Sequence, residues 1–241
     1  MIFSERLLSN SKVTLTVVTN PASATCTLTY NEQSYETKSA IVPKGTTVSY
    51  SIYHSTYGTT TGTITMDSDK TINFEGTYST STVTTSWTNP TNLTANGTLG
   101  GSSFAVSGKS GTYASWKMFD GNGNTFAQAP ANKTLIIYNP IAVCLTEVYY
   151  KAYDYLHNVY GVQEVAYAST ETGTRTTVYS EKISDFTAER TYSFSSNTAY
   201  AKYWFISYEK TGNGGFAMYT CTLTGKTKTT SYTYYWEKTI T

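Results

Sequence analysis

The feature that most constrains the fold of this chain is a period-two alternation of apolar and hydroxyl-bearing side chains. Val13, Leu15 and Val17 alternate with threonines, and Val48 and Tyr50 open another run of the same kind. Successive side chains of a β-strand point to opposite faces, so strict alternation is typical of half-buried antiparallel strands. We therefore predict an all-β fold.

Turn signals divide residues 13–78 into short strands. They occur at Tyr30-Asn31-Glu32, Pro43-Lys44-Gly45, Asp67-Ser68-Asp69 and two further sites, Asn20-Pro21 and Tyr57-Gly58. Short strands separated by turns at this spacing are typical of a small β-sandwich. Residues 13–78 are accordingly predicted to form the first domain.

This first segment resembles the PEGA and bacterial immunoglobulin-like modules of surface and virion proteins. The resemblance is carried by the strand leading into Pro21-Ala22-Ser23-Ala24, by the turn over residues 42–48 and by Tyr57-Gly58, whose order is inverted relative to the usual Gly-Tyr. It implies an immunoglobulin-like β-sandwich that serves as a spacer or adhesive module and has no active site.

The remaining chain is predicted to form a linker and a second β domain. Residues 79–92 are rich in Ser and Thr and indicate an inter-domain connection, with an edge strand as the alternative. Residues 93–241 contain seven further strand patterns: Leu135–Tyr138, Val143–Ala152, Val162–Ser169, Thr176–Tyr179, Thr191–Phe194, Ala201–Tyr208 and Phe216–Leu223. Tyr232, Tyr234 and Trp236 share one face of an extra C-terminal strand, which either completes the core or pairs with a neighbour.

The segment from Trp116 to Thr125 joins a short apolar run to a glycine-punctuated turn that carries Asp120, Asn122 and a threonine hydroxyl. A tight turn accounts for this composition if Asp120 accepts hydrogen bonds from local backbone amides while Gly121 and Gly123 take positive φ angles. That interpretation needs no metal and no ligand.

The order of motifs around this turn is similar to the discoidin, or coagulation factor 5/8 type C, family. The match runs over about 130 residues, from the Phe119–Thr125 turn through the strands at 134–138 and 202–206 to a closing Leu223-Thr224-Gly225. It implies a galactose-binding-like β jelly roll, a scaffold that includes many carbohydrate-binding modules.

The same resemblance implies a structural calcium ion, with Asp120, Asn122 and Thr125 as ligands, because calcium prefers several oxygen ligands. The alternative is no cofactor. Two positions depart from the family: Thr220 stands where a glutamate is usual, and Phe126 stands where a tryptophan usually follows the threonine. A missing carboxylate lowers affinity for a divalent ion, while Phe126 could fill the same core space.

Two segments mix aromatic rings with amides and charges in the way that sugar-binding loops do. The predicted ligand-binding residues are Tyr153, Tyr155, His157, Tyr160, Lys210, Asn213 and Phe216. Glycines around Asn213 indicate a flexible or tightly turned loop. The alternative is that most of the 23 tyrosines pack in the core or across strands.

Composition argues against several other functions. With 17 basic and 16 acidic residues, the chain lacks the basic surface of a nucleic-acid-binding protein. Cys26, Cys144 and Cys221 form no short-spaced cluster with each other or with a histidine, so we expect buried thiols rather than a zinc or redox site. The alternative is one Cys-Cys pair if the protein acts outside a cell. The acidic residues are scattered, so no glycosidase pair is indicated and we predict no enzyme.

The longest apolar stretch is interrupted by Asn139-Pro140, so no membrane span is expected.

Residues 1–12 are predicted to form an attachment arm. Ile2, Phe3, Leu7 and Leu8 could form one or two amphipathic turns, which are too short to be stable alone and would order against a partner. The alternative is a frayed end. The segment lacks the basic start and long apolar core of a secretion signal, so synthesis in a host cytoplasm is expected.

Together these features predict a non-enzymatic bacteriophage structural protein, such as a capsid decoration, head fibre or tail fibre component. Its arm would bind other virion proteins, and its lectin-like distal domain would bind a host surface glycan. Exposed β edges favour a homo-oligomer or a larger assembly. The alternatives are a bacterial surface or secreted carbohydrate-binding module, and an architectural virion cement protein that binds no glycan.

Overall fold

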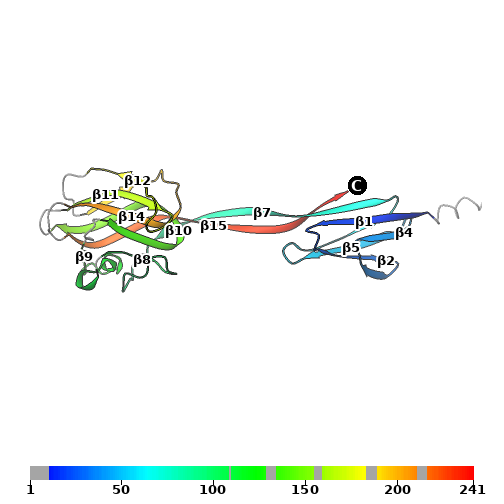
Figure 1. The fold of residues 1–241 in the computed structure, drawn as a ribbon, viewed down its shortest axis with the longest axis horizontal. Coiled ribbons are helices and arrows are strands. Elements are labelled where there is room, and N and C mark those ends of the chain that lie inside the picture. Colours follow the sequence, from blue (N-terminus) through cyan, green and yellow to red (C-terminus); the bar gives the residue numbers. More distant parts are fainter. Residues whose placement is uncertain (1–10, 109, 129–133, 155–158, 183–188, 211–215) are drawn as a thin grey trace, which may run out of the picture. The chain divides into compact units, whose positions relative to one another are not determined.

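The computed structural model describes residues 11–108, 110–128, 134–154, 159–182, 189–210 and 216–241. These residues form strands, together with the two short 3-10 helices η1 (Gly111–Tyr113) and η2 (Ser115–Phe119) (Figure 1). The chain is all-β, as the alternation predicts. It divides into unit 1, residues 1–81 and 230–241, and unit 2, residues 82–229.

Unit 1 is a sandwich of two sheets. One is the four-stranded antiparallel sheet β3-β2-β5-β6, and the other contains β15-β7-β1-β4. The strand bounds are β1 Lys12–Asn20, β2 Thr25–Tyr30, β3 Gln33–Glu36, β4 Ser39–Pro43, β5 Thr47–His54, β6 Gly58–Thr65, β7 Lys70–Thr88 and β15 Phe216–Ile240. Of these, β7 and β15 run from one unit into the other.

The core of unit 1 is built by the residues whose alternation predicts it. Leu15 from β1, Leu28 from β2 and Ile52 from β5 are all fully buried in one cluster with Ile72 and Phe74 from β7. Their neighbours in sequence point outward and are mostly hydroxyl-bearing, so the outer faces of the sheets are polar. The sandwich predicted for residues 13–78 is therefore present.

The C-terminal segment differs from the prediction, which places it in the second domain. Residues 230–241 belong to unit 1, where Thr71 and Thr241 exchange two backbone hydrogen bonds and Trp236 packs against the core cluster. For residues 79–88 the strand alternative holds in place of the linker, because β7 continues as a regular strand to Thr88. Polar threonine-rich strands have exposed side chains on both faces, which is why their composition resembles that of a loop.

Unit 2 places its strands in the order β12-β11-β14-β10-β15-β7, with β8, β9 and β13 pairing at the sides. Its remaining bounds are β8 Ala105–Val106, β9 Ala127–Gln128, β10 Thr134–Asp154, β11 Val159–Ala168, β12 Thr176–Ser180, β13 Glu189–Ser193 and β14 Ala201–Lys210. Strand β10 changes partner at a register shift between Tyr138 and Val143: its first part pairs with β14, and its second part pairs with β13 and β15.

Because β10 pairs with two groups of strands, both of its parts contribute to the large buried cluster of unit 2. Leu135 and Ile137 from the first part of β10 lie in one buried cluster with Val148 and Tyr150 from its second part. Trp204 is also buried there and donates its indole N–H to the carbonyl oxygen of Val143.

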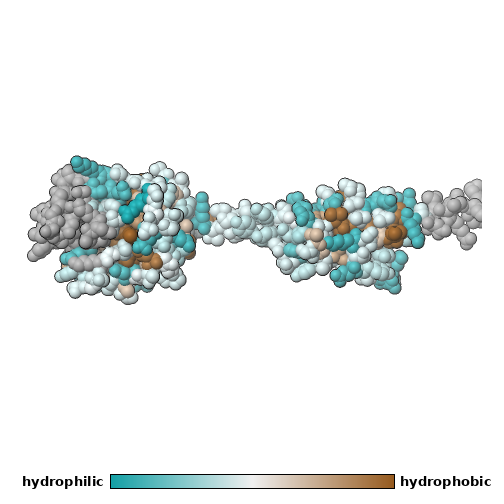
Figure 2. Space-filling view, viewed as in Figure 1, coloured by the Kyte–Doolittle hydropathy of each residue, from teal (hydrophilic) through white to brown (hydrophobic). Residues whose placement is uncertain are grey.

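The three cysteines are free and buried, as predicted. Hydrophilic and intermediate residues cover most of the surface visible in Figure 2. Within the described ranges, no helix has the length and apolar character needed to cross a membrane.

Candidate functional site

The strand ends that flank the two predicted ligand-binding segments lie together at one end of unit 2. The first lies between the end of β10 at Asp154 and the start of β11, and the second lies between the end of β14 at Lys210 and the start of β15 at Phe216. Val159 pairs with Lys210 and Asp154 pairs with Phe216, so all four strand ends are neighbours. We call this the loop end of unit 2.

Further chain segments reach the same end. Gln128 of β9 pairs with Ala217 near the start of β15, and Thr134 at the start of β10 pairs with Ser207 near the end of β14. Glu189, which begins β13, pairs with Lys151 near the end of β10. Several strand ends therefore lie together at the loop end.

The structure places the predicted ligand-binding residues only through their backbone. Tyr153, Tyr160, Lys210 and Phe216 lie in strands at the loop end. Tyr155, His157 and Asn213 lie outside the described residues, as do the arm residues Ile2, Phe3, Leu7 and Leu8. Their predicted roles stay predictions.

A surface cluster of three aromatic rings lies beside the loop end, and the sequence analysis did not predict it. Tyr113 and Phe126 are stacked with ring centroids 4.9 Å apart, and Phe126 also contacts Tyr219 at 5.7 Å. Tyr113 is 36% exposed. Phe126 directly precedes β9, and Tyr219 follows the two residues of β15 that pair with β9.

The prediction that Phe126 fills the core space of a tryptophan is wrong. Its side chain is partly exposed, and the neighbouring Ala127 takes the buried position. Alternation alone could not decide which of these two neighbours faces the core, because β9 is only two residues long.

Polar contacts surround the start of β13 at the same end. Tyr149 donates its hydroxyl to a carboxylate oxygen of Glu189 at 2.6 Å, which raises the pKa of Tyr149 to about 12. Arg190 donates from Nη2 to both carboxylate oxygens of Glu181, at 2.9 and 3.0 Å. Hydrogen bonds from Tyr179 and then from Arg190 hold the pKa of Glu181 below its usual value.

The Asp120 turn is a self-contained hydrogen-bonded structure. One carboxylate oxygen of Asp120 accepts the backbone N–H of Asn122 at 2.8 Å, and the other accepts the hydroxyl of Thr125 at 2.5 Å. The side-chain oxygen of Asn122 accepts the N–H of Asn124 at 3.0 Å. Helix η2 anchors the turn, because its residue Phe119 is 1% exposed and packs in the core.

Glycine is required at one of the two turn positions. Gly121 has a φ of +72°, and a Cβ there would lie 2.5 Å from the carbonyl oxygen of Thr91. Gly123 does not have the expected positive φ, and a Cβ there would meet nothing within 4 Å.

The oxygen atoms that the turn could offer as ligands fit a calcium ion poorly. Asp120 supplies a single carboxylate, and the side-chain oxygens of Asp120 and Asn122 already accept hydrogen bonds within the turn. Calcium sites use six to eight oxygens, and their affinity depends on the number of charged ligands. The described residues contain no group of three or more His, Cys, Asp or Glu side chains that could hold a metal.

Comparison of the sequence with protein families gives no match, and comparison with curated proteins also gives none. Solved structures do match. One is the family 32 carbohydrate-binding module from Clostridium perfringens NanJ, solved with galactose, which is 17% identical over 51% of this chain and 92% of its own, with a TM-score of 0.38.

Two further matches are of similar extent. A family 32 module from a family 31 glycoside hydrolase of Clostridium perfringens is 19% identical over 50% of this chain and 92% of its own, with a TM-score of 0.40. Chitosan-binding module 1 from a chitosanase/glucanase of Paenibacillus sp. IK-5 is 18% identical over 55% of this chain and 97% of its own, with a TM-score of 0.38. Family 32 modules have the galactose-binding-like jelly-roll fold that the sequence predicts for the second domain.

These matches do not concern the predicted PEGA resemblance of unit 1 or the predicted virion role. Both stay predictions.

Proposed function

We propose that unit 2 is a non-catalytic, lectin-like domain that binds a glycan at its loop end. The observation that supports this proposal is the strand register, which pairs the strand ends flanking the two segments predicted for sugar binding: Val159 opposite Lys210, and Asp154 opposite Phe216. Sequence spacing alone leaves these segments more than fifty residues apart.

The aromatic cluster of Tyr113, Phe126 and Tyr219 supplies the second element that a sugar site needs. The C–H face of a pyranose packs against an aromatic ring, and nearby amides, hydroxyls and charges bind its hydroxyl groups. The three rings hold each other in place, so little side-chain entropy remains to be lost when a ligand binds.

The setting of this binding also belongs to the proposal. A virion protein that contacts host glycan and a bacterial carbohydrate-binding module would use the same loop end but would have different partners. Pull-down of assembled capsids or tails by the purified chain distinguishes them, because only the virion role predicts capture.

The proposal is tested by screening the full chain on a glycan array and titrating the best ligands by calorimetry, with galactose, N-acetylglucosamine and chitosan oligomers included. We expect Phe126→Ala and Tyr219→Ala to weaken binding about tenfold or more, a loss of roughly 1.4 kcal/mol. Tyr200→Ala is the matched control, because Tyr200 is partly exposed and lies at the opposite end of β14. Absence of any glycan binding, or an equal loss in the control, would reject the proposal.

A further inference from the structure

The outer face of the four-stranded sheet in unit 1 carries hydroxyl groups in register across three strands. Thr29 of β2 pairs with Ser49 of β5, which pairs with Thr63 of β6. Ser51 and Thr61 form the next row. The buried residues Leu28, Val48 and Ile64 alternate with these positions, so the hydroxyl side chains point away from the core.

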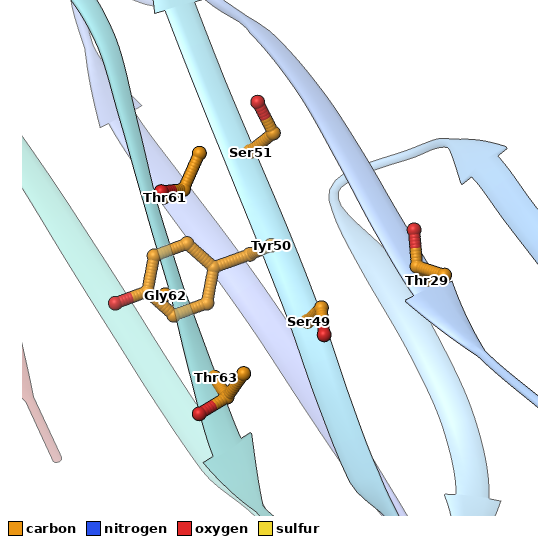
Figure 3. Close-up of a pocket in the computed structure, with 7 residues that line it drawn as sticks. All are labelled: Thr29, Ser49, Tyr50, Ser51, Thr61, Gly62 and Thr63. Carbon is orange, nitrogen blue, oxygen red and sulfur yellow. The ribbon is translucent and has the colours of Figure 1, made fainter.

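These residues line a shallow hollow with a volume of about 370 Å³ (Figure 3). The hollow follows from residue size: the central strand contributes Ser49 and Ser51, whereas the strands on both sides contribute the larger threonines. The result is a trough along β5 with serine at its base. Its volume lies within the range of ligand pockets, about 300–1,000 Å³, although it is open to solvent.

Four of the five hydroxyls are available to a ligand. The hydroxyl of Thr29 shares a hydrogen bond of 2.8 Å with that of Ser34. Within the described part of the chain, the hydroxyls of Ser49, Ser51, Thr61 and Thr63 have no recorded protein partner. Each hydroxyl offers one donor and two acceptor positions, so it can either donate a hydrogen bond to a sugar hydroxyl or accept one from it.

An exposed aromatic ring follows on the same face of β5, beyond the residues that line the trough. Tyr53 is the next outward residue of β5 after Ser51, and it pairs with Thr25 on one side and Thr59 on the other. It is 51% exposed, and no ring contact is recorded for it among the described residues. An exposed tyrosine ring can cover the apolar face of a pyranose and donate its hydroxyl at the same time.

The lining of the trough carries no charged side chain among the residues described. The nearest outward charge in register is Glu36, which pairs with Thr27 in the row of Ser51. A neutral polyhydroxylated ligand therefore fits better than a phosphate or a polyanion, for which basic side chains would be expected.

The base of the trough is held from the core side. The ring of Tyr50 lies against the backbone of Gly62, where a Cβ would be 2.3 Å from the tyrosine hydroxyl. Lys238 donates a hydrogen bond of 3.0 Å to that hydroxyl. This packing fixes β5 against β6 and keeps the two rows of hydroxyls in register.

From this arrangement we infer that unit 1 has its own sugar-binding site, formed by the trough and Tyr53, which takes a neutral pyranose or a chain of them. The site is separate from the loop end of unit 2 and does not depend on the function proposed there.

The test is titration of the isotope-labelled full chain with glucose, galactose, mannose, N-acetylglucosamine, lactose and cellobiose, monitored by amide chemical shifts. We expect at least one sugar to cause saturable shifts at residues of β5 and β6. Tyr53→Ala and Ser51→Val should each weaken this binding about tenfold. Valine suits an outward strand position, so Ser51→Val fills the trough without disrupting the fold.

Thr65→Ala is the matched control, because Thr65 pairs with Thr47 on the same face but outside the trough, and it should bind as the parent does. The double variant Phe126→Ala/Tyr219→Ala should keep the unit 1 response whether or not unit 2 binds glycan. Lack of saturable shifts in β5 and β6, or an equal loss in Thr65→Ala, would overturn the inference.

Discussion

Trp236 donates its indole N–H to the backbone carbonyl oxygen of Gly58, at a distance of 3.1 Å. The two residues are 178 positions apart, and the bond connects the C-terminal part of β15 to the first residue of β6. The ring of Trp236 also contacts those of Tyr57 and Phe74, at centroid distances of 5.1 and 6.4 Å. Unit 1 is therefore completed by the last segment of the chain.

Replacing Trp236 with alanine should destabilise unit 1 by about 3 kcal/mol, because a large ring and its hydrogen bond are removed from a packed site. Amide hydrogen exchange reports this directly: protection in β5, β6 and the start of β7 should fall. Tyr235→Ala is the control, since Tyr235 is 40% exposed and lies on the opposite face of β15, and it should change stability by less than about 0.5 kcal/mol. Equal effects of the two changes would contradict this account.

Gly121→Ala should destabilise unit 2 by roughly 2 kcal/mol, because its φ of +72° strains any side chain and the added Cβ would clash with Thr91. Gly123→Ala should be neutral or slightly stabilising, since nothing lies within 4 Å of the added carbon. Denaturant unfolding of both variants checks the contrast. A neutral Gly121→Ala would show that the backbone at this turn differs from that described.

Calcium at millimolar concentration should leave the melting temperature unchanged, because the Asp120 turn satisfies its own donors and acceptors. Asp120→Ala should cost about 1–2 kcal/mol through the two lost hydrogen bonds, with or without calcium. Thermal melts in calcium and in chelator measure both effects. A bound ion would instead raise the melting temperature by mass action, and Asp120→Ala would abolish that rise.

Unit 2 should lose stability as the pH rises above about 8.5, and more steeply above about 10. Burial raises the pKa of Tyr150, of Tyr208 and of the Cys221 thiol, the last to about 12. The folded state therefore keeps protons that the unfolded state releases above its ordinary pKa values, near 8.5 for Cys and 10 for Tyr. The stabilisation is complete at lower pH and is lost as the pH rises toward the folded-state values.

Denaturant unfolding between pH 8 and 11.5 should show this decline, and absorbance near 295 nm should report tyrosines that ionise only on unfolding. Tyr208→Phe removes one of the responsible groups and should reduce the slope of stability against pH. An unchanged slope in that variant would mean that Tyr208 is not protected from ionisation in the folded state.

The site proposed at the loop end shows how much of it could be predicted from the sequence. Residues such as Tyr153 and Lys210 could be selected from their chemistry, but their proximity depends on the pairing of Val159 with Lys210 and of Asp154 with Phe216. The register between strands far apart in sequence depends on how their buried faces pack together, so it cannot be predicted from a short stretch of sequence. The aromatic cluster of Tyr113, Phe126 and Tyr219 was missed for the same reason, since its rings come from three separate segments.

The sequence by itself determined the all-β class, the core-facing positions of unit 1 and the burial of the cysteines, because alternation is a local consequence of strand geometry. It also identified the Asp120 turn, whose hydrogen bonds join residues at most five positions apart. Only the tertiary structure decided that Trp236 belongs to unit 1, that residues 79–88 continue a strand, and that Ser49 and Ser51 line a trough. These features arise from pairing between residues far apart in sequence, which depends on the complete fold.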